Sequence, residues 1–221
     1  MRWSALVLAA GAARRFGAAK LLAPFSGAPL IRRTAQGVCA ASFAEVLVVT
    51  GAQTAQIAAA LEGLECRILA APDWQEGMAA SLRAGVAVLA PESRGVCIFL
   101  GDMPLVPVHL CGELAARAEA AGYAARPQVA GKPGHPAAFT RAAFSDLMAL
   151  QGDRGANRLL AERGSAVAYV DTADAGALLD VDTPDDLAAA QRAWQARATS
   201  ATTDSAISRG ALEKPANPMG A

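Results

Sequence analysis

Small and basic residues follow the first apolar run of the chain, between Leu8 and Lys20. The segment reads LAAGAARRFGAAK, and its small side chains let a ligand approach backbone N–H groups that can cradle an anion. Arg15 and Lys20 add two cations beside that cradle, as a triphosphate requires. The segment is neither GxGxxG nor GxxxxGKS/T, which disfavours a Rossmann dinucleotide site and a Walker NTPase. A glycine-containing turn with solvated basic residues is the alternative interpretation.

An aspartate stands at the end of another apolar run, in the sequence LGDMP. Asp102 follows residues 95–100, and a carboxylate at the tip of a buried strand is well placed to hold a hard cation. Mg²⁺ typically uses one or two carboxylates together with substrate phosphates. Asp102 is therefore a candidate Mg²⁺ ligand, and a carboxylate that caps the following turn is the alternative.

Two further carboxylates lie near the end of the chain, in the sequence DVDTPDDL. Asp180 and Asp182 are two residues apart, so on an extended segment they point the same way. Both are candidate additional metal ligands. Asp182 can also N-cap the helix predicted after Pro184, and capping is the stronger of its two expected roles.

The elements that must position these residues alternate along the first half of the chain. Apolar runs rich in Val, Leu and Ile predict buried strands at residues 4–10, 45–50, 66–70 and 95–100. Apolar side chains that recur at three and four residues predict helices at residues 30–41, 54–62 and 78–89. This alternation predicts a three-layer, Rossmann-like, doubly wound α/β fold with a mostly parallel sheet. Ligands bind beyond the carboxyl ends of such strands, so the segments after the first and fourth strands are expected to meet.

The second half of the chain is less regular. Further helices are predicted at residues 108–121, near 142–150 and 157–163, and from about residue 185, with a strand at 166–170. No repeat or linker divides the chain, so residues 1–197 are predicted to form one domain. Residues 198–221 are rich in Ala, Ser, Thr and Pro without periodicity, which predicts a disordered tail. Trp74 is predicted to be a core aromatic in preference to a wall for a flat ligand.

Composition and charge narrow the class of protein. Hydrophobic residues make up 53% of the 221 residues, and Lys+Arg and Asp+Glu both count 20, so the net charge is zero. This balance argues against a nucleic-acid surface and a polybasic membrane patch, and the first apolar stretch is too short to span a bilayer. The cysteines show no CxxC pair and lie in apolar runs, which predicts buried, reduced thiols in a cytoplasmic protein: Cys39, Cys66, Cys97 and Cys111.

Six motifs in order carry a family resemblance over nearly everything before the tail. They are LAAGxxxRxGxxK at 8–20, GMAASLRAG at 77–85, LGDMP at 100–104, GHP at 134–136, GDRGA at 152–156 and DVDTPDDL at 180–187. In these motifs the chain resembles the molybdenum cofactor cytidylyltransferases, within the wider MobA-like group of NTP transferases. The resemblance implies a nucleotidyltransferase fold of the nucleotide-diphospho-sugar transferase type.

The resemblance also implies a role for each matched position. The residues implied to bind the nucleotide are Ala9, Ala10, Gly11, Arg15, Lys20, Ser81 and Asp102. Those implied to act directly in catalysis are Arg15, Lys20 and Asp102. The metal ligands are implied to be Asp102, Asp180 and Asp182. The acceptor side is implied to contain His135, Asp153 and Arg154. For His135, a tight turn between its glycine and proline neighbours is the alternative.

The implied reaction transfers CMP from CTP to a molybdopterin-type molybdenum cofactor, with Mg²⁺ as cofactor and pyrophosphate as leaving group. The LAAG sequence, in place of the LAGG of guanylyl-transferring relatives, favours CTP over GTP. A recipient molybdoenzyme or its chaperone is the implied protein partner.

Other functions remain open at this point. A transferase of the same fold can use GTP, or a sugar phosphate or phospholactate-type acceptor. A non-catalytic molybdopterin-binding chaperone is an alternative of another class, although mere binding needs no triphosphate cradle. A nicotinamide-dependent oxidoreductase is disfavoured, because no GxGxxG follows the first strand.

Overall fold

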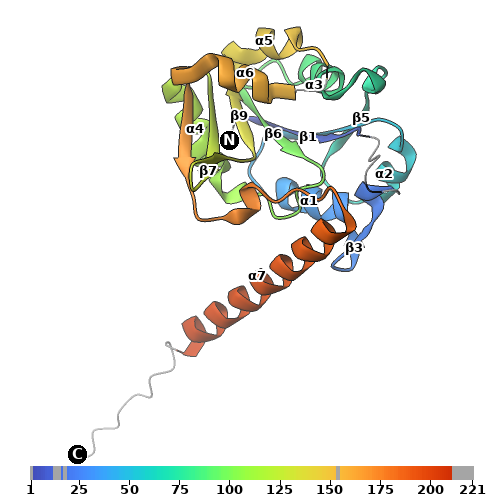
Figure 1. The fold of residues 1–221 in the computed structure, drawn as a ribbon, viewed down its shortest axis with the longest axis vertical. Helices are drawn as coiled ribbons and strands as arrows, with labels where there is room; N and C mark the ends of the chain where they lie inside the picture. The colour runs from blue at the N-terminus through green and yellow to red at the C-terminus, as the bar shows by residue number, and fades with distance from the viewer. Residues whose placement is uncertain (1, 12–15, 17–18, 153–154, 211–221) are drawn as a thin grey trace, which may run out of the picture.

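A central sheet with helices on both faces organises the chain (Figure 1). The computed structural model describes residues 2–11, 16, 19–152 and 155–210, with side chains up to residue 199. The strands follow the order β10-β7-β9-β6-β1-β4-β5, and β8 pairs with β7 beside this path. This is the predicted three-layer, mostly parallel α/β architecture.

The four strands predicted in the first half form the parallel part of the sheet. They are β1 (Ser4–Ala9), β4 (Glu45–Thr50), β5 (Arg67–Ala70) and β6 (Gly95–Leu100). β1 pairs in parallel with both β4 and β6, and β4 pairs in parallel with β5. Most of β1, β4 and β6 is buried on both faces, which explains their continuous apolar runs.

The second half of the sheet contains an antiparallel insertion that the sequence pattern did not reveal. β9 (Ala137–Thr140) lies between β6 and β7 (Ala124–Val129) and runs antiparallel to both. β8 (Lys132–Pro133) also pairs antiparallel to β7, and β10 (Val167–Asp171) pairs with β7 in parallel. As a result β6, β7 and β10 all end at the same edge as β1, which collects segments from both halves of the chain.

The helices divide between the two faces of the sheet. On one face lie α1 (Leu30–Cys39), α2 (Thr54–Ala60) and α4 (Cys111–Ala121), whose apolar side chains share a core with Val7 and Phe99. On the other face lie α3 (Met78–Ala87), α5 (Phe144–Ala149) and α6 (Gly155–Arg163), packed on Leu6 and Ile98. Neighbouring strand residues thus point to opposite cores.

A third, smaller core joins the start and the end of the chain. The hairpin of β2 (Pro24–Phe25) and β3 (Ala28–Pro29) contributes Phe25, which stacks edge-on against Trp194 of α7 (Pro184–Gly210). α7 continues past position 198, where a disordered tail was predicted, and extends away from the body (Figure 1). Its alanine-rich sequence explains this, because alanine propagates a helix that packing has already nucleated. Residues 211–221 lie outside the described residues.

Short 3₁₀ turns connect several of these elements: Lys20–Leu22 (η1), Trp74–Glu76 (η2), Val108–Leu110 (η3), Arg141–Ala143 (η4), Gly164–Ala166 (η5) and Ala175–Ala177 (η6). Within the described part of the chain, no helix is long and apolar enough to cross a membrane.

The cysteines agree only in part with the prediction. All four are free thiols, and Cys97 and Cys111 are buried. Cys39 and Cys66 are only half-buried, because they lie at the end of α1 and just before β5, where the core meets the surface. Burial is the largest of the causes that raise the pKa of Cys39 to about 11, so this thiol is a poor nucleophile at neutral pH.

The strand order reverses at β1, whose neighbours β4 and β6 lie on either side of it. The connections that follow β1 and β6 therefore leave the sheet in opposite directions and open a crevice between them. In doubly wound folds this switch point is where ligands bind.

Two helical glycines test how tightly α3 packs on the sheet. A Cβ at Gly85 would overlap the Leu6 side chain and lie 3.0 Å from Val49 Cγ2, whereas a Cβ at Gly112 in α4 meets nothing within 4 Å. We expect Gly85→Ala to lower the free energy of unfolding by about 1–3 kcal/mol through overpacking. Gly112→Ala should raise it by up to about 1 kcal/mol through helix propensity. Urea denaturation measures both; equal effects would contradict the tight α3–sheet contact.

Candidate functional site

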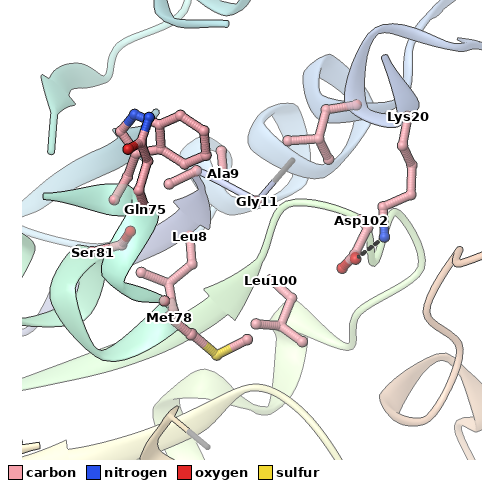
Figure 2. Close-up of a pocket in the computed structure, with 13 residues that line it drawn as sticks. Leu8, Ala9, Gly11, Lys20, Gln75, Met78, Ser81, Leu100 and Asp102 are labelled. Atoms are coloured by element: carbon pink, nitrogen blue, oxygen red, sulfur yellow. Dashed lines mark hydrogen bonds and ion pairs between the residues drawn. The ribbon is translucent and has the colours of Figure 1, made fainter. Parts of the chain in front are cut away.

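A cavity of about 630 Å³ opens at the carboxyl ends of β1 and β6 (Figure 2). Its volume is in the range typical of small-molecule sites. Figure 2 shows Ser81 and Gln75 on one side of it and Lys20 and Asp102 on the other. The cavity is lined by Leu8, Ala9, Ala10, Gly11, Lys20, Leu21, Trp74, Gln75, Gly77, Met78, Ser81, Leu100 and Asp102.

Lys20 and two aspartates form an ion-pair cluster at one end of this cavity. Lys20 Nζ donates to Asp102 Oδ2 at 2.7 Å and to Asp182 Oδ1 at 2.9 Å. The side chains of Lys20, Asp102 and Asp182 are 11%, 20% and 43% exposed, so the cluster is shielded at Lys20 and open at Asp182. A charge this buried is tolerated only with such partners.

The turn after β6 is fixed by contacts to both neighbours. Gly101 donates its N–H to the Leu8 carbonyl at 2.9 Å, and its own carbonyl accepts from Thr34 Oγ1 at 2.9 Å. A Cβ at Gly101 would lie 2.9 Å from Ile31 Cδ1 and 3.1 Å from Leu8 O, so only glycine allows this close approach. Asp102 is thereby held beside the end of β1, as predicted from its place after the strand.

The segment that carries Asp180 and Asp182 is anchored between them. Val181 is fully buried in the third core and donates its N–H to the Asp102 carbonyl at 3.1 Å. The expected capping role of Asp182 is wrong. Thr183 Oγ1 accepts from the Asp186 N–H at 3.2 Å, and Asp186 Oδ2 accepts from the Thr183 N–H at 2.8 Å, a reciprocal cap of α7. Asp182 is therefore available to Lys20.

Electrostatics in the cluster follow from these contacts. Burial lowers the pKa of Lys20, but the charges and hydrogen bonds of Asp102 and then Asp182 outweigh it, so the pKa is raised overall. The pKa of Asp180 is raised, chiefly by burial and also by the negative charges of Asp102 and Asp182. The site thus concentrates more negative charge than Lys20 alone neutralises.

These oxygen donors suit a hard divalent cation, although Lys20 now lies between two of them. Asp102 Oδ1 is buried and has no hydrogen-bond partner among the described residues. In the same part of the chain, no group of three or more His, Cys, Asp or Glu side chains is arranged to hold a metal ion. Of the three predicted metal ligands, Asp102 and Asp182 meet at Lys20. Asp180 lies close enough for their negative charges to raise its pKa. The donor set fits Mg²⁺ or Mn²⁺ by its chemistry.

The other end of the cavity is lined mainly by small and apolar residues. Ser81, in the first turns of α3, is 3% exposed, and Ala10 is 7% exposed. Gly77 precedes this helix with φ of 110°, a conformation that favours glycine. Trp74 packs so closely that a Cβ at Gly51 would lie 2.7 Å from its Cγ. Trp74 thus serves both the core and the cavity wall, whereas the core alone was expected.

His135 lies near the cavity without lining it. Its N–H donates to the Ala177 carbonyl at 2.8 Å, and the neighbouring Gly134 carbonyl accepts from Arg126 Nε and Nη2 at 3.1 and 2.9 Å. The turn is therefore clamped from two sides. His135 Nδ1 is buried, with no hydrogen-bond partner in the described residues.

Three predicted site residues, Arg15, Asp153 and Arg154, lie outside the described residues. The flank of the GDRGA motif is described, and the Gly152 carbonyl accepts from the Ala79 N–H at 3.1 Å. This bond ties the motif to the start of α3, which lines the cavity.

Sequence reasoning missed several residues around the site. Gln75 and Met78 line the cavity, and Arg126 supports the turn that carries His135. Gln75 and Met78 flank Gly77, whose positive φ marks the turn, but a glycine between polar and apolar residues has many other uses. Arg126 lies within a strand, where no local motif singles it out.

Comparison with known proteins decides the family. Residues 5–168 match the model of the MobA-like NTP transferase domain, which is well over half of the chain. The chain belongs to this family. Its α/β fold and the position of the cavity at the switch point agree with that membership.

Two curated relatives match over most of their length. Nicotine blue oxidoreductase of Paenarthrobacter nicotinovorans is 31% identical over 189 residues, which cover 80% of this chain and 91% of that protein. The purine catabolism protein PucB of Bacillus subtilis (strain 168) is 29% identical over 199 residues, covering 84% and 94%. The family therefore includes proteins with quite different names.

Solved structures agree with the fold. Rv0371c from Mycobacterium tuberculosis H37Rv has a TM-score of 0.74 at 27% identity, covering 87% of this chain and 99% of that one. The same protein in complex with manganese has a TM-score of 0.70, covering 84% and 96%. A divalent metal has thus been found with a protein of this fold.

The burial of His135 predicts an acid-sensitive fold. Burial, and then the charge of Arg126, lower the pKa of His135 from 6.5 to about 4. Below pH 6.5 the unfolded chain binds a proton that the folded chain does not, so stability falls as pH falls from 6.5 towards 4. We expect a loss of roughly 2 kcal/mol between pH 7 and pH 5 from this group.

Urea denaturation at the two pH values measures this loss. His135→Gln should remove most of it, whereas His109→Gln, at an exposed position, should leave it in place. An unchanged pH dependence in His135→Gln would contradict the neutral, buried state of His135.

Proposed function

We propose that this chain transfers CMP from CTP to a molybdopterin-type molybdenum cofactor, with Mg²⁺ as cofactor and release of pyrophosphate. The observation that carries the proposal is the ion-pair cluster of Lys20, Asp102 and Asp182 at one end of a nucleotide-sized cavity. A cation and hard oxygen donors at a switch point match the needs of a metal-bound triphosphate. Membership of an NTP transferase family supports the same reaction class.

The end of the cavity away from Lys20 is proposed to take a pyrimidine base. The backbone of Ala9, Ala10 and Gly11 and the hydroxyl of Ser81 are the groups expected to contact base and ribose. Ala10 is nearly fully buried in the lining, so its methyl group occupies space that glycine would leave open. Less room at this point favours cytosine over the larger guanine.

Asp102 and Asp182 are the residues proposed to hold Mg²⁺, with Asp180 nearby. When bound, the ion supplies charge neutralisation on phosphate oxygens. Lys20 then gives up its contacts to the two carboxylates and donates to the triphosphate, where negative charge builds as pyrophosphate leaves. Arg15 is proposed to join it there. The ion then replaces Lys20 as the positive charge that faces the two carboxylates.

The proposed reaction requires the protein to position its two substrates, and it does not require a strong general base. A phosphate oxygen of the acceptor attacks the α-phosphorus of CTP, and the bond from that phosphorus to pyrophosphate breaks. An acceptor phosphate is already ionised at neutral pH, so no side chain must remove a proton. Positioning and charge neutralisation are the usual sources of rate in such transfers.

The acceptor side is proposed to lie toward His135, Asp153 and Arg154. His135 is on the turn clamped by Arg126, and the described flank of the GDRGA motif bonds to the start of α3. The bond from Ala79 to Gly152 ties the second of these segments to the helix that lines the cavity. The product is proposed to pass in the cytoplasm to a recipient molybdoenzyme or its chaperone.

A redox reaction is a second candidate, favoured by one relative alone. That relative is named nicotine blue oxidoreductase and is 31% identical to this chain. The ion-pair cluster argues for the transferase, because hydride transfer needs no pair of carboxylates beside a lysine. The two functions differ in which nucleotide stabilises the protein.

A thermal-shift panel with CTP, GTP, ATP and UTP, each with Mg²⁺, and with NAD(P)H tests both candidates. We expect CTP to raise the melting temperature most, because only a ligand of the folded state stabilises it. Ala10→Gly should narrow the preference for CTP over GTP by about tenfold in Kd, the scale of one methyl group in a pocket. Ala71→Gly, at a buried alanine outside the lining, should keep the preference.

The panel has clear contrary outcomes. Protection by NAD(P)H and by none of the triphosphates would replace the transferase with the redox enzyme. A GTP preference would overturn the base choice and leave the reaction class standing.

Asp102→Asn tests the metal-holding role. Loss of one electrostatic stabiliser should lower kcat by at least ~10²-fold and weaken Mn²⁺ binding measured by electron paramagnetic resonance. Asp185→Asn, at an exposed position in the first turn of α7, removes a nearby carboxylate and should change neither quantity. Unchanged turnover in Asp102→Asn would remove Asp102 from the metal site.

A further inference from the structure

We propose a second binding subsite, made by Arg126, Tyr169 and Asn157, that takes a flat, anionic ring compound. This deepens the proposed function, on which its role as the place of the acceptor ring rests. None of the three residues belongs to a motif of the sequence or lines the nucleotide cavity.

Arg126 is a buried cation whose hydrogen-bond partners among the described residues are all neutral. It is 7% exposed, and its Nε and Nη2 donate to the Gly134 carbonyl while Nη1 donates to Asn157 Oδ1 at 3.1 Å. No carboxylate pairs with it among the described residues. A guanidinium has five N–H groups, so these contacts leave donors over. An arriving anion can accept from these donors and offset the buried positive charge.

Tyr169 places an aromatic ring beside this cation. Arg126 of β7 and Tyr169 of β10 are directly paired across parallel strands. Two residues away, Ala124 and Val167 both belong to the core under α3, α5 and α6, so the two side chains point to that same face. Tyr169 is 45% exposed, because β10 is an edge strand of the sheet. The exposed ring next to a guanidinium offers a stacking surface.

Asn157 opens the site to solvent and links it to α6. It is exposed in the first turn of α6, so the Nη1 end of Arg126 lies nearest to the surface. The same helix begins at Gly155, where a Cβ would lie 2.7 Å from Met78 Sδ. Met78 lines the nucleotide cavity. Figure 1 shows α6 and α3 over the same face of the sheet, and the closeness of Gly155 to Met78 links the helix that carries Asn157 to the cavity wall.

The chemistry of the three side chains selects the ligand class. The planar guanidinium donates to carboxylates or other anionic oxygens in its own plane and also stacks on rings. The phenol ring of Tyr169 packs against flat apolar faces. His135 Nδ1, buried and without a partner in the described residues, lies close enough to Arg126 for its pKa to be lowered by that charge. A flat heteroaromatic anion uses both the guanidinium and the phenol ring; a small spherical anion leaves the aromatic ring unused.

Fluorescence titration with 6-carboxypterin, a flat anionic heterocycle, tests the subsite without any turnover. We expect the full chain to bind it, and Arg126→Met to weaken Kd by at least about tenfold, the scale of a lost charge-assisted hydrogen bond. Tyr169→Ala, at a surface position, should weaken Kd about fivefold. Arg158→Met is the matched control, because Arg158 also lies on α6 but pairs with Glu162 at 2.6 Å; its Kd should stay unchanged.

Two further ligands separate the contribution of charge from that of shape: orthophosphate is an anion without a ring, and 6-methylpterin is a flat ring without the carboxylate. Both should bind at least about tenfold more weakly than 6-carboxypterin. The inference is overturned if the unmodified chain does not bind 6-carboxypterin, if Arg126→Met and Tyr169→Ala both bind it unchanged, or if orthophosphate binds as tightly. The melting shift with CTP and Mg²⁺ checks that each variant folds. That shift also keeps the two proposals apart, because it tests the transferase without using the subsite.

Discussion

The ammonium group of Lys20 is the interaction on which the site depends. It joins residues that are 82 and 162 positions away along the chain, Asp102 and Asp182. The contact joins three segments that are far apart in the sequence, at the edge of the sheet. Two carboxylates brought this close repel each other, and the positive charge of the lysine between them offsets that repulsion. Any substrate that takes the lysine away must supply positive charge in return.

The fold makes this meeting possible through its topology. The antiparallel insertion of β9 lets β6 and β7 run the same way, so both end at the edge where β1 ends. A single face of the sheet then presents α3 beside the nucleotide cavity and α6 beside Arg126. The groups proposed to bind nucleotide and acceptor thus lie over one face of the sheet.

Much of this arrangement was predictable from the residues. The continuous apolar runs of β1, β4 and β6 fix buried parallel strands, and the position of Asp102 after one of them follows directly. The direction of β9 was not predictable, because a run of four small and aromatic residues suits either orientation. The cap of α7 was misassigned to Asp182, since Thr183 and Asp186 also have the spacing of a reciprocal cap. Long-range contacts such as that of Lys20 with Asp182 leave no local trace.

The anchoring of Val181 bears on where the functional domain of such a protein ends. The match to the family model ends at residue 168, yet Val181 bonds to the Asp102 carbonyl and holds a carboxylate on each side of it near the cavity. Asp180 and Asp182, the proposed metal-site residues of this segment, therefore lie outside the part of the chain that the family model matches. A protein cut after residue 168 would lose the last three residues of β10, and with them Asp180, Val181 and Asp182.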